Sequence, residues 1–206
     1  MGKVHKKTYD KGILAITGAS GAVYGLHLMQ ELARHCGNLA VVISKSGEEV
    51  LRRELGIDFG GTHSTVQRRL RELARAENIH FYENDNLAAP PSSGSAGYSI
   101  MVVAPCTMGT LARIAQGMSS CLIERAADVI LKEGKKLILL PRETPLSAIH
   151  LENMLKLSRL DVGIVPAMPG FYHHPVSIDD MVHFVVGKVL DYAGLEHELY
   201  ERWSEH

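Results

Sequence analysis

Short apolar runs alternate along this chain with longer segments in which apolar residues recur at helical spacing. Each apolar run is typical of a buried strand in a parallel sheet, because such a strand is covered on both faces. Each longer segment is typical of an amphipathic helix that covers one face of a sheet. The alternation predicts an α/β fold in which right-handed crossovers connect parallel strands.

The apolar runs predict strands at 13–16, 39–44, 79–82, 99–104, 136–140 and 162–165. The predicted helices are 23–32, 48–55, 62–76, 107–116, 121–132, 147–160 and 177–193. The last helix starts with Ser177 and Asp180 at the spacing of a capping box. We therefore predict a doubly wound parallel sheet of Rossmann-like (flavodoxin-like) type, which is a three-layer α/β sandwich.

The chain has 206 residues, enough for one large core, and we predict a single domain over residues 1–206. It would start with a tail, 1–11, and end with an extension, 194–206. Residues 83–98 and 166–176 lack a regular pattern and are rich in proline and glycine, which indicates loops. We interpret both as active-site loops, although their composition fits a surface connection as well.

The first predicted strand ends in the glycine-rich turn TGASGA, which leads directly into the first helix. A helix N-terminus offers backbone N–H groups and a partial positive charge, so such a unit can bind phosphate. The spacing of Gly18, Gly21 and Gly25 is that of neither a dinucleotide fingerprint nor a Walker loop. A tight connection is the alternative, and Ser20 is either a helix N-cap or a hydroxyl that faces a ligand.

Small and polar residues follow the carboxyl ends of several predicted strands. They are Gly18, Ala19 and Ser20, then Ser44, then Thr107, Met108, Gly109 and Thr110, then Arg142 and Glu143, and finally Tyr172. In a doubly wound sheet, ligands bind in the crevice beyond those ends. Two helix N-termini and the Arg142 guanidinium therefore predict a site for a phosphorylated ligand.

Several of the charged and aromatic candidates have simpler interpretations. Glu143 is either a salt-bridge partner of its neighbour or a general acid or base. Lys132 ends a helix, where a lysine commonly complements the helix dipole. Tyr172 is either a packed aromatic or a phosphate-directed hydroxyl. Glu54 and Lys188 both fit the solvated face of a helix.

Composition excludes several classes of function. The formal net charge of −1 argues against a nucleic-acid binder, and no apolar run approaches the length of a membrane span. The basic N-terminal residues lead into a short core strand, which a secretory signal would not do. The three cysteines have no paired spacing, which suits reduced thiols in a cytoplasmic protein. None of the 11 histidines lies in a zinc-binding pattern, so no metal site is predicted.

Five blocks of sequence carry a family resemblance. They are ITGASGAVYGLHL, SSGS, MVVAPCTMGTLARIA, RAADVILKEGKKLILLPRETPL and PGFYHHPVSIDDMVHFVVGKVLD. Together they resemble the UbiX-type flavin prenyltransferases, in the family's order, over residues 12–193. The resemblance implies FMN binding and metal-independent transfer of a dimethylallyl group from dimethylallyl phosphate to flavin N5 and C6. It also implies a UbiD-type decarboxylase as recipient of the prenylated FMN, and a homododecamer with FMN at subunit contacts, where 83–98 could cover a neighbour's flavin.

The resemblance also implies roles for individual residues. The FMN-binding positions are Gly18, Ala19, Ser20, Ser44, Thr107, Met108, Gly109, Thr110 and Arg142. The positions for the substrate phosphate are Tyr172, Lys188, Lys132, Arg142 and Glu143, and the catalytic ones are Glu143, Lys132, Ser20 and Glu54. Without a metal, a leaving phosphate needs clustered cations and a nearby acid, which this set provides.

Two further hypotheses share the fold. One is an FMN-dependent decarboxylase of cysteinyl peptides, which would not need the cations Lys132, Arg142 and Lys188. The other is a flavin-binding module without catalysis. Analysis of flavin incubated with dimethylallyl phosphate distinguishes the first hypothesis from these two.

Overall fold

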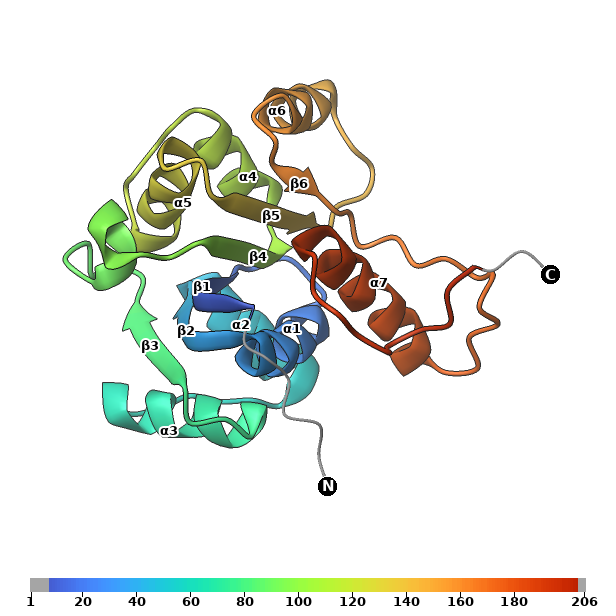
Figure 1. Cartoon of the computed structure of the whole chain (residues 1–206), viewed down its shortest axis with the longest axis horizontal. Coiled ribbons are helices and arrows are strands. Elements are labelled where there is room, and N and C mark those ends of the chain that lie inside the picture. The colour runs from blue at the N-terminus through green and yellow to red at the C-terminus, as the bar shows by residue number, and fades with distance from the viewer. Residues whose placement is uncertain (1–7, 204–206) are drawn as a thin grey trace.

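The computed structural model describes residues 8–203, and these form a parallel sheet with helices on both faces (Figure 1). The strands are β1 Tyr9–Ile16, β2 Cys36–Ile43, β3 Ile79–Glu83, β4 Ile100–Cys106, β5 Lys136–Pro141 and β6 Gly163–Ile164. Their order in the six-stranded sheet is β3-β2-β1-β4-β5-β6. The predicted doubly wound fold is therefore confirmed.

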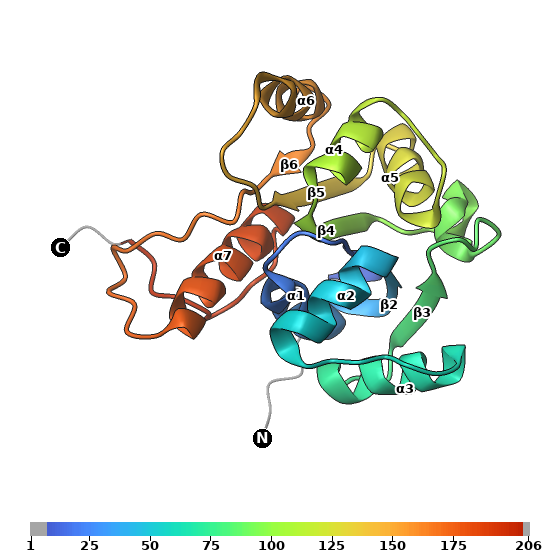
Figure 2. The same ribbon diagram turned by 180° about the vertical axis from the view of Figure 1, so that it is seen from behind.

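The helices are α1 Ala22–His35, α2 Lys45–Leu55, α3 His63–Ala74, α4 Met108–Ala115, α5 Leu122–Lys132, α6 Ala148–Ser158 and α7 Ile178–Ala193. Alternate residues of a strand point to opposite faces, and β1 follows this rule. Leu14 and Ile16 pack into the core that includes α1, α3 and α7, whereas Ile13 and Ala15 pack into the core formed with α4 and α5 (Figure 2).

The first strand starts earlier than its apolar run. Tyr9 pairs with Cys36 of β2, and the Thr8 N–H donates to the carbonyl of His35 at 2.9 Å. Residues 9–11 therefore belong to the sheet, which corrects the predicted tail of 1–11, while residues 1–7 lie outside the described residues. The pattern missed this part because polar Asp10 and Lys11 break the apolar run.

Residues 84–98 form the predicted loop, which connects β3 to β4. The segment contains two 3-10 turns, Pro90–Ser92 and Gly94–Ala96. Near its start, the Asn84 carbonyl accepts from the Leu122 N–H at the beginning of α5, at 2.7 Å. Near its end, Lys11 Nζ donates to the Ala96 carbonyl at 2.7 Å. Only the first residues of this segment therefore lie at the carboxyl edge of the sheet in their own subunit.

Candidate functional site

The strand order reverses between β1 and β4, and one buried threonine joins the loops that follow them. Thr17 Oγ1 donates to the Pro105 carbonyl at 2.8 Å and accepts from the Thr107 N–H at 2.9 Å. The glycine-rich turn and the start of α4 are thereby held side by side at the switch point, where doubly wound folds bind ligands. Sequence analysis missed Thr17, because its partners lie about ninety residues away.

Gly18 allows the turn to approach the first turn of α2 closely. A Cβ at this position would lie 2.4 Å from the Cβ of Ser46, so no larger residue fits without movement. At the same place Ser44 caps α2, since its Oγ accepts from the Gly47 N–H at 3.0 Å. The hydroxyls of Ser44 and Ser46 lie 3.1 Å apart, beside the glycine-rich turn.

The N-terminus of α1 already holds a carboxylate. The N-cap is Gly21, with φ at +110°, so the alternative in which Ser20 is the N-cap is wrong. The N–H groups of Gly21 and Ala22 donate to Glu54 Oε2 at 2.9 and 2.8 Å. These two groups are therefore not free for a ligand phosphate, and Glu54, although exposed, is bound as an anion at a helix N-terminus.

Glu54, Ser20 and Arg142 meet beside this helix N-terminus. Arg142 Nε donates to the Ser20 carbonyl at 3.1 Å, and the Ser20 side chain hydrogen-bonds to Glu54. Partial burial alone would raise the pKa of Glu54, but the hydrogen bonds from Ser20, Gly21 and Ala22 and the charge of Arg142 outweigh it and lower this pKa. The structure thus brings together three predicted site residues from the ends of β1 and β5 and from α2.

Replacing Glu54 with alanine is expected to lower the melting temperature at pH 7 by about 2–4 °C, because a helix cap contributes about 1 kcal/mol. A carboxyl whose pKa is lowered by folding stabilises above its ordinary value of 4.5 and loses that contribution as the pH falls below it. The melting difference should therefore shrink below pH 4.5. Thermal melts from pH 3 to 8 test this, with Glu152→Gln as the exposed control. A pH-independent difference would contradict the assignment.

The second helix N-terminus at the switch point is that of α4. Thr107 Oγ1 accepts from the Thr110 N–H at 3.1 Å and lies 3.0 Å from the Thr110 hydroxyl. The first N–H groups of a helix have no acceptor within it, and a Cβ at Gly109 would meet nothing closer than 3.5 Å. This end of α4 is therefore open to a ligand.

An ion pair between the half-exposed Arg113 and the buried Glu124 fixes α4 in place. Glu124, whose side chain is 3 % exposed, pairs with Arg113 Nε and accepts from the Ser120 N–H at 2.8 Å. Burial would raise the pKa of Glu124, but these contacts lower it, so the carboxylate stays charged against Arg113. Since Glu124 lies on α5, the pair joins the two helices.

These groups fit a flavin nucleotide. Hydroxyls at Ser20, Ser44 and Thr107 and the open N-terminus of α4 suit ribityl and phosphate oxygens. The half-buried Arg142 guanidinium adds a fixed positive charge. Among the described residues, no group of three or more His, Cys, Asp or Glu side chains is placed to hold a metal ion.

Glu143 follows Arg142 and is exposed. Its Oε1 accepts from the Thr144 N–H at 3.0 Å. Within residues 8–203 no ion pair joins Glu143 to Arg142, so the salt-bridge alternative is not supported. The carboxylate is available at the carboxyl edge of the sheet, and its role in proton transfer stays a prediction.

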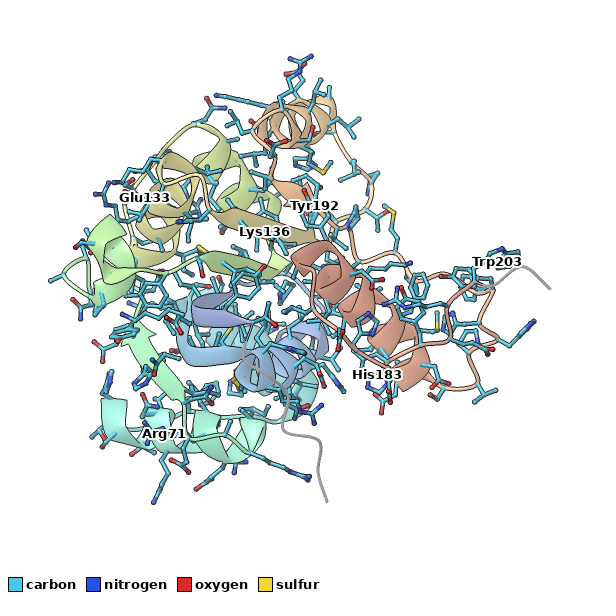
Figure 3. The ribbon with its side chains drawn as sticks, viewed as in Figure 1. Arg71, Glu133, Lys136, His183, Tyr192 and Trp203 are labelled. Atoms are coloured by element: carbon cyan, nitrogen blue, oxygen red, sulfur yellow. The ribbon has the colours of Figure 1, made fainter. Side chains whose placement is uncertain are left out.

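Tyr172 and Lys188 form a second cluster, on α7 and the segment before it. The ring of Phe184 has two neighbours in this cluster. The Tyr172 ring packs edge-on against it with the ring centres 5.5 Å apart, and Lys188 Nζ lies 5.2 Å from its centre. Hydrogen bonds with Tyr200 and Tyr172 outweigh partial burial and raise the pKa of Lys188, so the ammonium stays charged. The cluster extends to Trp203, whose ring lies 5.5 Å from that of Tyr172 (Figure 3).

Lys132 lies apart from both clusters. It ends α5, where its Nζ bonds to Glu133 Oε1 at 2.7 Å, and the chain then enters β5 at Lys136. Arg142 follows the opposite end of β5. Within one chain the structure therefore does not bring Lys132 together with Arg142, although the sequence predicts one phosphate site for both.

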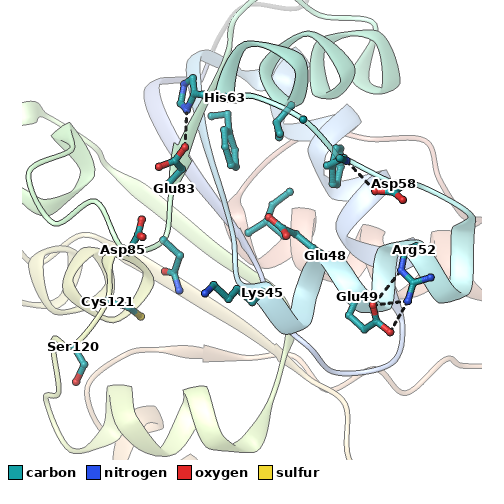
Figure 4. Close-up of a pocket in the computed structure, with 17 residues that line it drawn as sticks. Lys45, Glu48, Glu49, Arg52, Asp58, His63, Glu83, Asp85, Ser120 and Cys121 are labelled. Atoms are coloured by element: carbon teal, nitrogen blue, oxygen red, sulfur yellow. Dashed lines mark hydrogen bonds and ion pairs between the residues drawn. The ribbon is translucent and has the colours of Figure 1, made fainter.

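A cavity lies at the ends of β2 and β3, where Lys45, Phe81 and Glu83 are among its lining residues. It measures about 810 Å³, and carboxylates gather around it, including Glu48, Asp58, Glu83 and Asp85 (Figure 4). Burial, together with the negative charge of Asp58, raises the pKa of Glu48 despite the opposing effect of Lys45. Acidic side chains outnumber Lys45 and Arg52 in the lining, so this cavity suits a phosphorylated ligand less well than the switch point does.

The parallel sheet and the donors at its switch point define the class as a flavin-binding α/β protein. The model of the Flavoprotein family matches residues 3–190. The flavin prenyltransferase UbiX of Halalkalibacterium halodurans is 48% identical over 204 residues, which are 98% of this chain and 96% of the relative. The chain therefore belongs to the Flavoprotein family and, within it, to the UbiX flavin prenyltransferases.

Two solved structures agree with this assignment. That of AnUbiX (PadA1) in complex with FMN and dimethylallyl pyrophosphate has a TM-score of 0.85 at 38% identity, covering 96% of this chain and 99% of that one. That of a dodecameric FMN-dependent UbiX-like decarboxylase from Escherichia coli O157:H7 has a TM-score of 0.84 at 45% identity, covering 95% and 100%. Among the residues that the present structure describes, no helix is both long and apolar enough to cross a bilayer.

Proposed function

We propose that this chain transfers the dimethylallyl group of dimethylallyl phosphate to N5 and C6 of reduced FMN and releases phosphate without a metal. The observation that carries the proposal is the cluster of Ser20, Glu54 and Arg142 at the switch point. The cluster places a fixed cation and a carboxylate–hydroxyl pair at the edge of the sheet where the flavin donors lie. The names of the relatives support the same reaction.

Reduced FMN supplies the nucleophilic N5 and C6 atoms when it is bound. In the proposal, the flavin is held by Ser20, Ser44, Arg142 and the N-terminus of α4. The same binding site is lined by Gly18, Ala19, Met108, Gly109 and Thr110. Arg142 neutralises negative charge there through its guanidinium, which can hold two phosphate oxygens at once. Ser20 and Glu54 are proposed to handle a proton between them, since they are hydrogen-bonded to each other.

The leaving phosphate needs positive charge and a proton donor. We assign the charge to Lys188 and Arg142, with the Tyr172 hydroxyl as an additional donor. Glu143 then relays a proton to the leaving oxygen. Each added charge or donor is effective mainly where water is excluded, because the effective dielectric constant is low there.

We further propose that the complete site forms between subunits of a homododecamer. Lys132 lies at the opposite edge of its own sheet, so it can reach a phosphate near Arg142 only from a neighbouring subunit. The residues of the 83–98 segment beyond Asn84 are directed toward that same edge and could cover a neighbour's flavin. The dodecameric Escherichia coli relative supports such an assembly.

The product, prenylated FMN, is proposed to pass to a UbiD-type decarboxylase, and the protein is proposed to be cytoplasmic. No disulfide joins any of the cysteines among the described residues, and this agrees with a reducing compartment.

Incubation of the protein with reduced FMN and dimethylallyl phosphate under anaerobic conditions is expected to increase the flavin mass by one dimethylallyl group. Mass spectrometry of the extracted flavin tests this, with the Arg142→Met variant and a reaction without protein as controls. An unchanged flavin in the presence of wild-type protein, together with release of carbon dioxide from cysteinyl peptides, would favour the decarboxylase instead.

A further inference from the structure

We propose that Tyr200 and Asp191 are positioning residues that hold the Lys188 ammonium toward Tyr172 and the substrate phosphate. This inference rests on the phosphate-binding role proposed above for Lys188. It extends the site to the chain after α7, which the sequence indicated only as a C-terminal extension of residues 194–206.

The segment after α7 folds back along one face of that helix. Phe184, Gly187, Lys188 and Asp191 share this face, because residues three, four and seven positions apart align on a helix. A Cβ at Gly187 would lie 2.5 Å from Cε1 of Tyr200 and 2.8 Å from Cε1 of His197. The absence of a side chain at position 187 therefore lets the returning segment lie directly on the helix.

Asp191 anchors the returning segment through three side chains. Its Oδ2 accepts from the Tyr200 hydroxyl at 2.5 Å, and its Oδ1 lies 2.6 Å from Arg202 Nη2 and 3.1 Å from His197 Nε2. The His197 side chain is only 1 % exposed, so this contact lies inside the protein. Tyr200 is thereby fixed both in the orientation of its ring and in the direction of its hydroxyl.

The fixed tyrosine then restricts the lysine. Lys188 Nζ lies 4.9 Å from the centre of the Tyr200 ring and 5.2 Å from that of Phe184, which is the distance range of cation–π contacts. The Tyr200 hydroxyl is also the main cause of the raised pKa of Lys188. A flexible lysine is thus held between two rings with its ammonium near Tyr172, and less side-chain freedom is lost when phosphate binds.

Tyr200→Phe is the informative variant, because it removes the hydroxyl and keeps the ring. We expect the KM for dimethylallyl phosphate to rise about five- to tenfold, with kcat changed less than about threefold, as for the loss of one hydrogen bond in binding. The affinity for FMN should stay the same, and the melting temperature should fall by only a few degrees, because Asp191 loses one hydrogen bond and keeps its contacts with His197 and Arg202. Tyr192→Phe is the matched control near the end of α7, where the ring packs against Gly163 of β6 and the hydroxyl lies 3.4 Å from the Asp161 carbonyl, and it should leave both constants unchanged.

A double-mutant cycle with Lys188→Met distinguishes positioning of the Lys188 ammonium from a general effect of Tyr200 on the stability of the fold. If Tyr200 acts through Lys188, Tyr200→Phe has no further effect on the KM in the Lys188→Met background. Additive effects would overturn the inference, as would wild-type kinetics for Tyr200→Phe. A parallel fall of kcat, FMN affinity and melting temperature would also overturn it, because that pattern indicates structural damage.

The proposed function is wrong if the wild-type protein leaves the mass of the flavin unchanged in the incubation with dimethylallyl phosphate, and this outcome is separate from the kinetics of the variants. In that case calorimetric titration with inorganic phosphate tests the inference directly. Weaker binding of phosphate by Tyr200→Phe than by Tyr192→Phe supports it. Equal binding by the two variants, or no binding by the wild type, overturns it.

Discussion

Glu143→Gln is expected to lower kcat by about 10²–10⁴-fold and to change the affinity for FMN by less than about threefold. Glutamine keeps the size of the side chain and the contact with the Thr144 N–H, but it has no proton to give to a leaving oxygen. The loss should therefore fall on turnover. Steady-state kinetics and a fluorescence titration with FMN measure the two effects independently.

Glu77→Gln is the matched control for this experiment. Glu77 is a surface carboxylate with its side chain 89 % exposed, and it lies between α3 and β3, away from the switch point. Its replacement should leave kcat and the affinity for FMN unchanged. If Glu143→Gln reduces turnover and FMN affinity by the same factor, Glu143 contributes to binding and is not the proton relay.

Gly18→Ala is expected to weaken FMN binding by about tenfold or more and to destabilise the fold by about 1–3 kcal/mol. The added methyl would lie 2.4 Å from the Cβ of Ser46 and 3.1 Å from its carbonyl carbon. Neither atom can rotate away, so the glycine-rich turn and the start of α2 must separate. That movement displaces Ser20 and Ser44, two of the proposed flavin donors.

Gly60→Ala serves as the control for a methyl group added without a clash. The nearest atom to its Cβ would be Asp58 Oδ1 at 3.4 Å, so binding and stability should change little. Thermal melts and FMN titrations of the two variants form the comparison. Wild-type affinity and stability in Gly18→Ala would show that the turn tolerates the separation and that its fit against α2 does not determine flavin binding.

Local pattern predicted most of the fold because the causes of strands and helices are local. The apolar run at 136–140 is β5 with one residue added, and the capping box of Ser177 and Asp180 starts α7 as expected. The boundaries failed where polar residues lie in a strand, as at Asp10 and Lys11. The segment 83–98 is a loop with two 3-10 turns, as its proline-rich and glycine-rich sequence indicated, and its role at the active site stays a prediction.

The candidate site was predicted in part, for a related reason. In a parallel sheet, residues after the carboxyl ends of strands must share one edge, so Ser20, Ser44, Thr107 and Arg142 could be assigned to it from order alone. The same topology should have assigned Lys132 to the other edge, because α5 returns the chain to the start of β5. The prediction for Lys132 came from the resemblance, which does not say which subunit contributes a residue.

The sequence by itself determined the class of fold, the edge of the sheet that carries the site and the family. These follow from the periodicity of apolar residues, the order of the predicted strands along the chain and short motifs, all of which can be identified from the sequence. Only the tertiary structure decided that Glu54 caps α1, that Thr17 joins the two loops of the switch point, and that the segment after α7 lies against Lys188. Those contacts join residues far apart in the chain or depend on how a segment folds back. The periodicity of apolar residues does not predict which such residues come into contact.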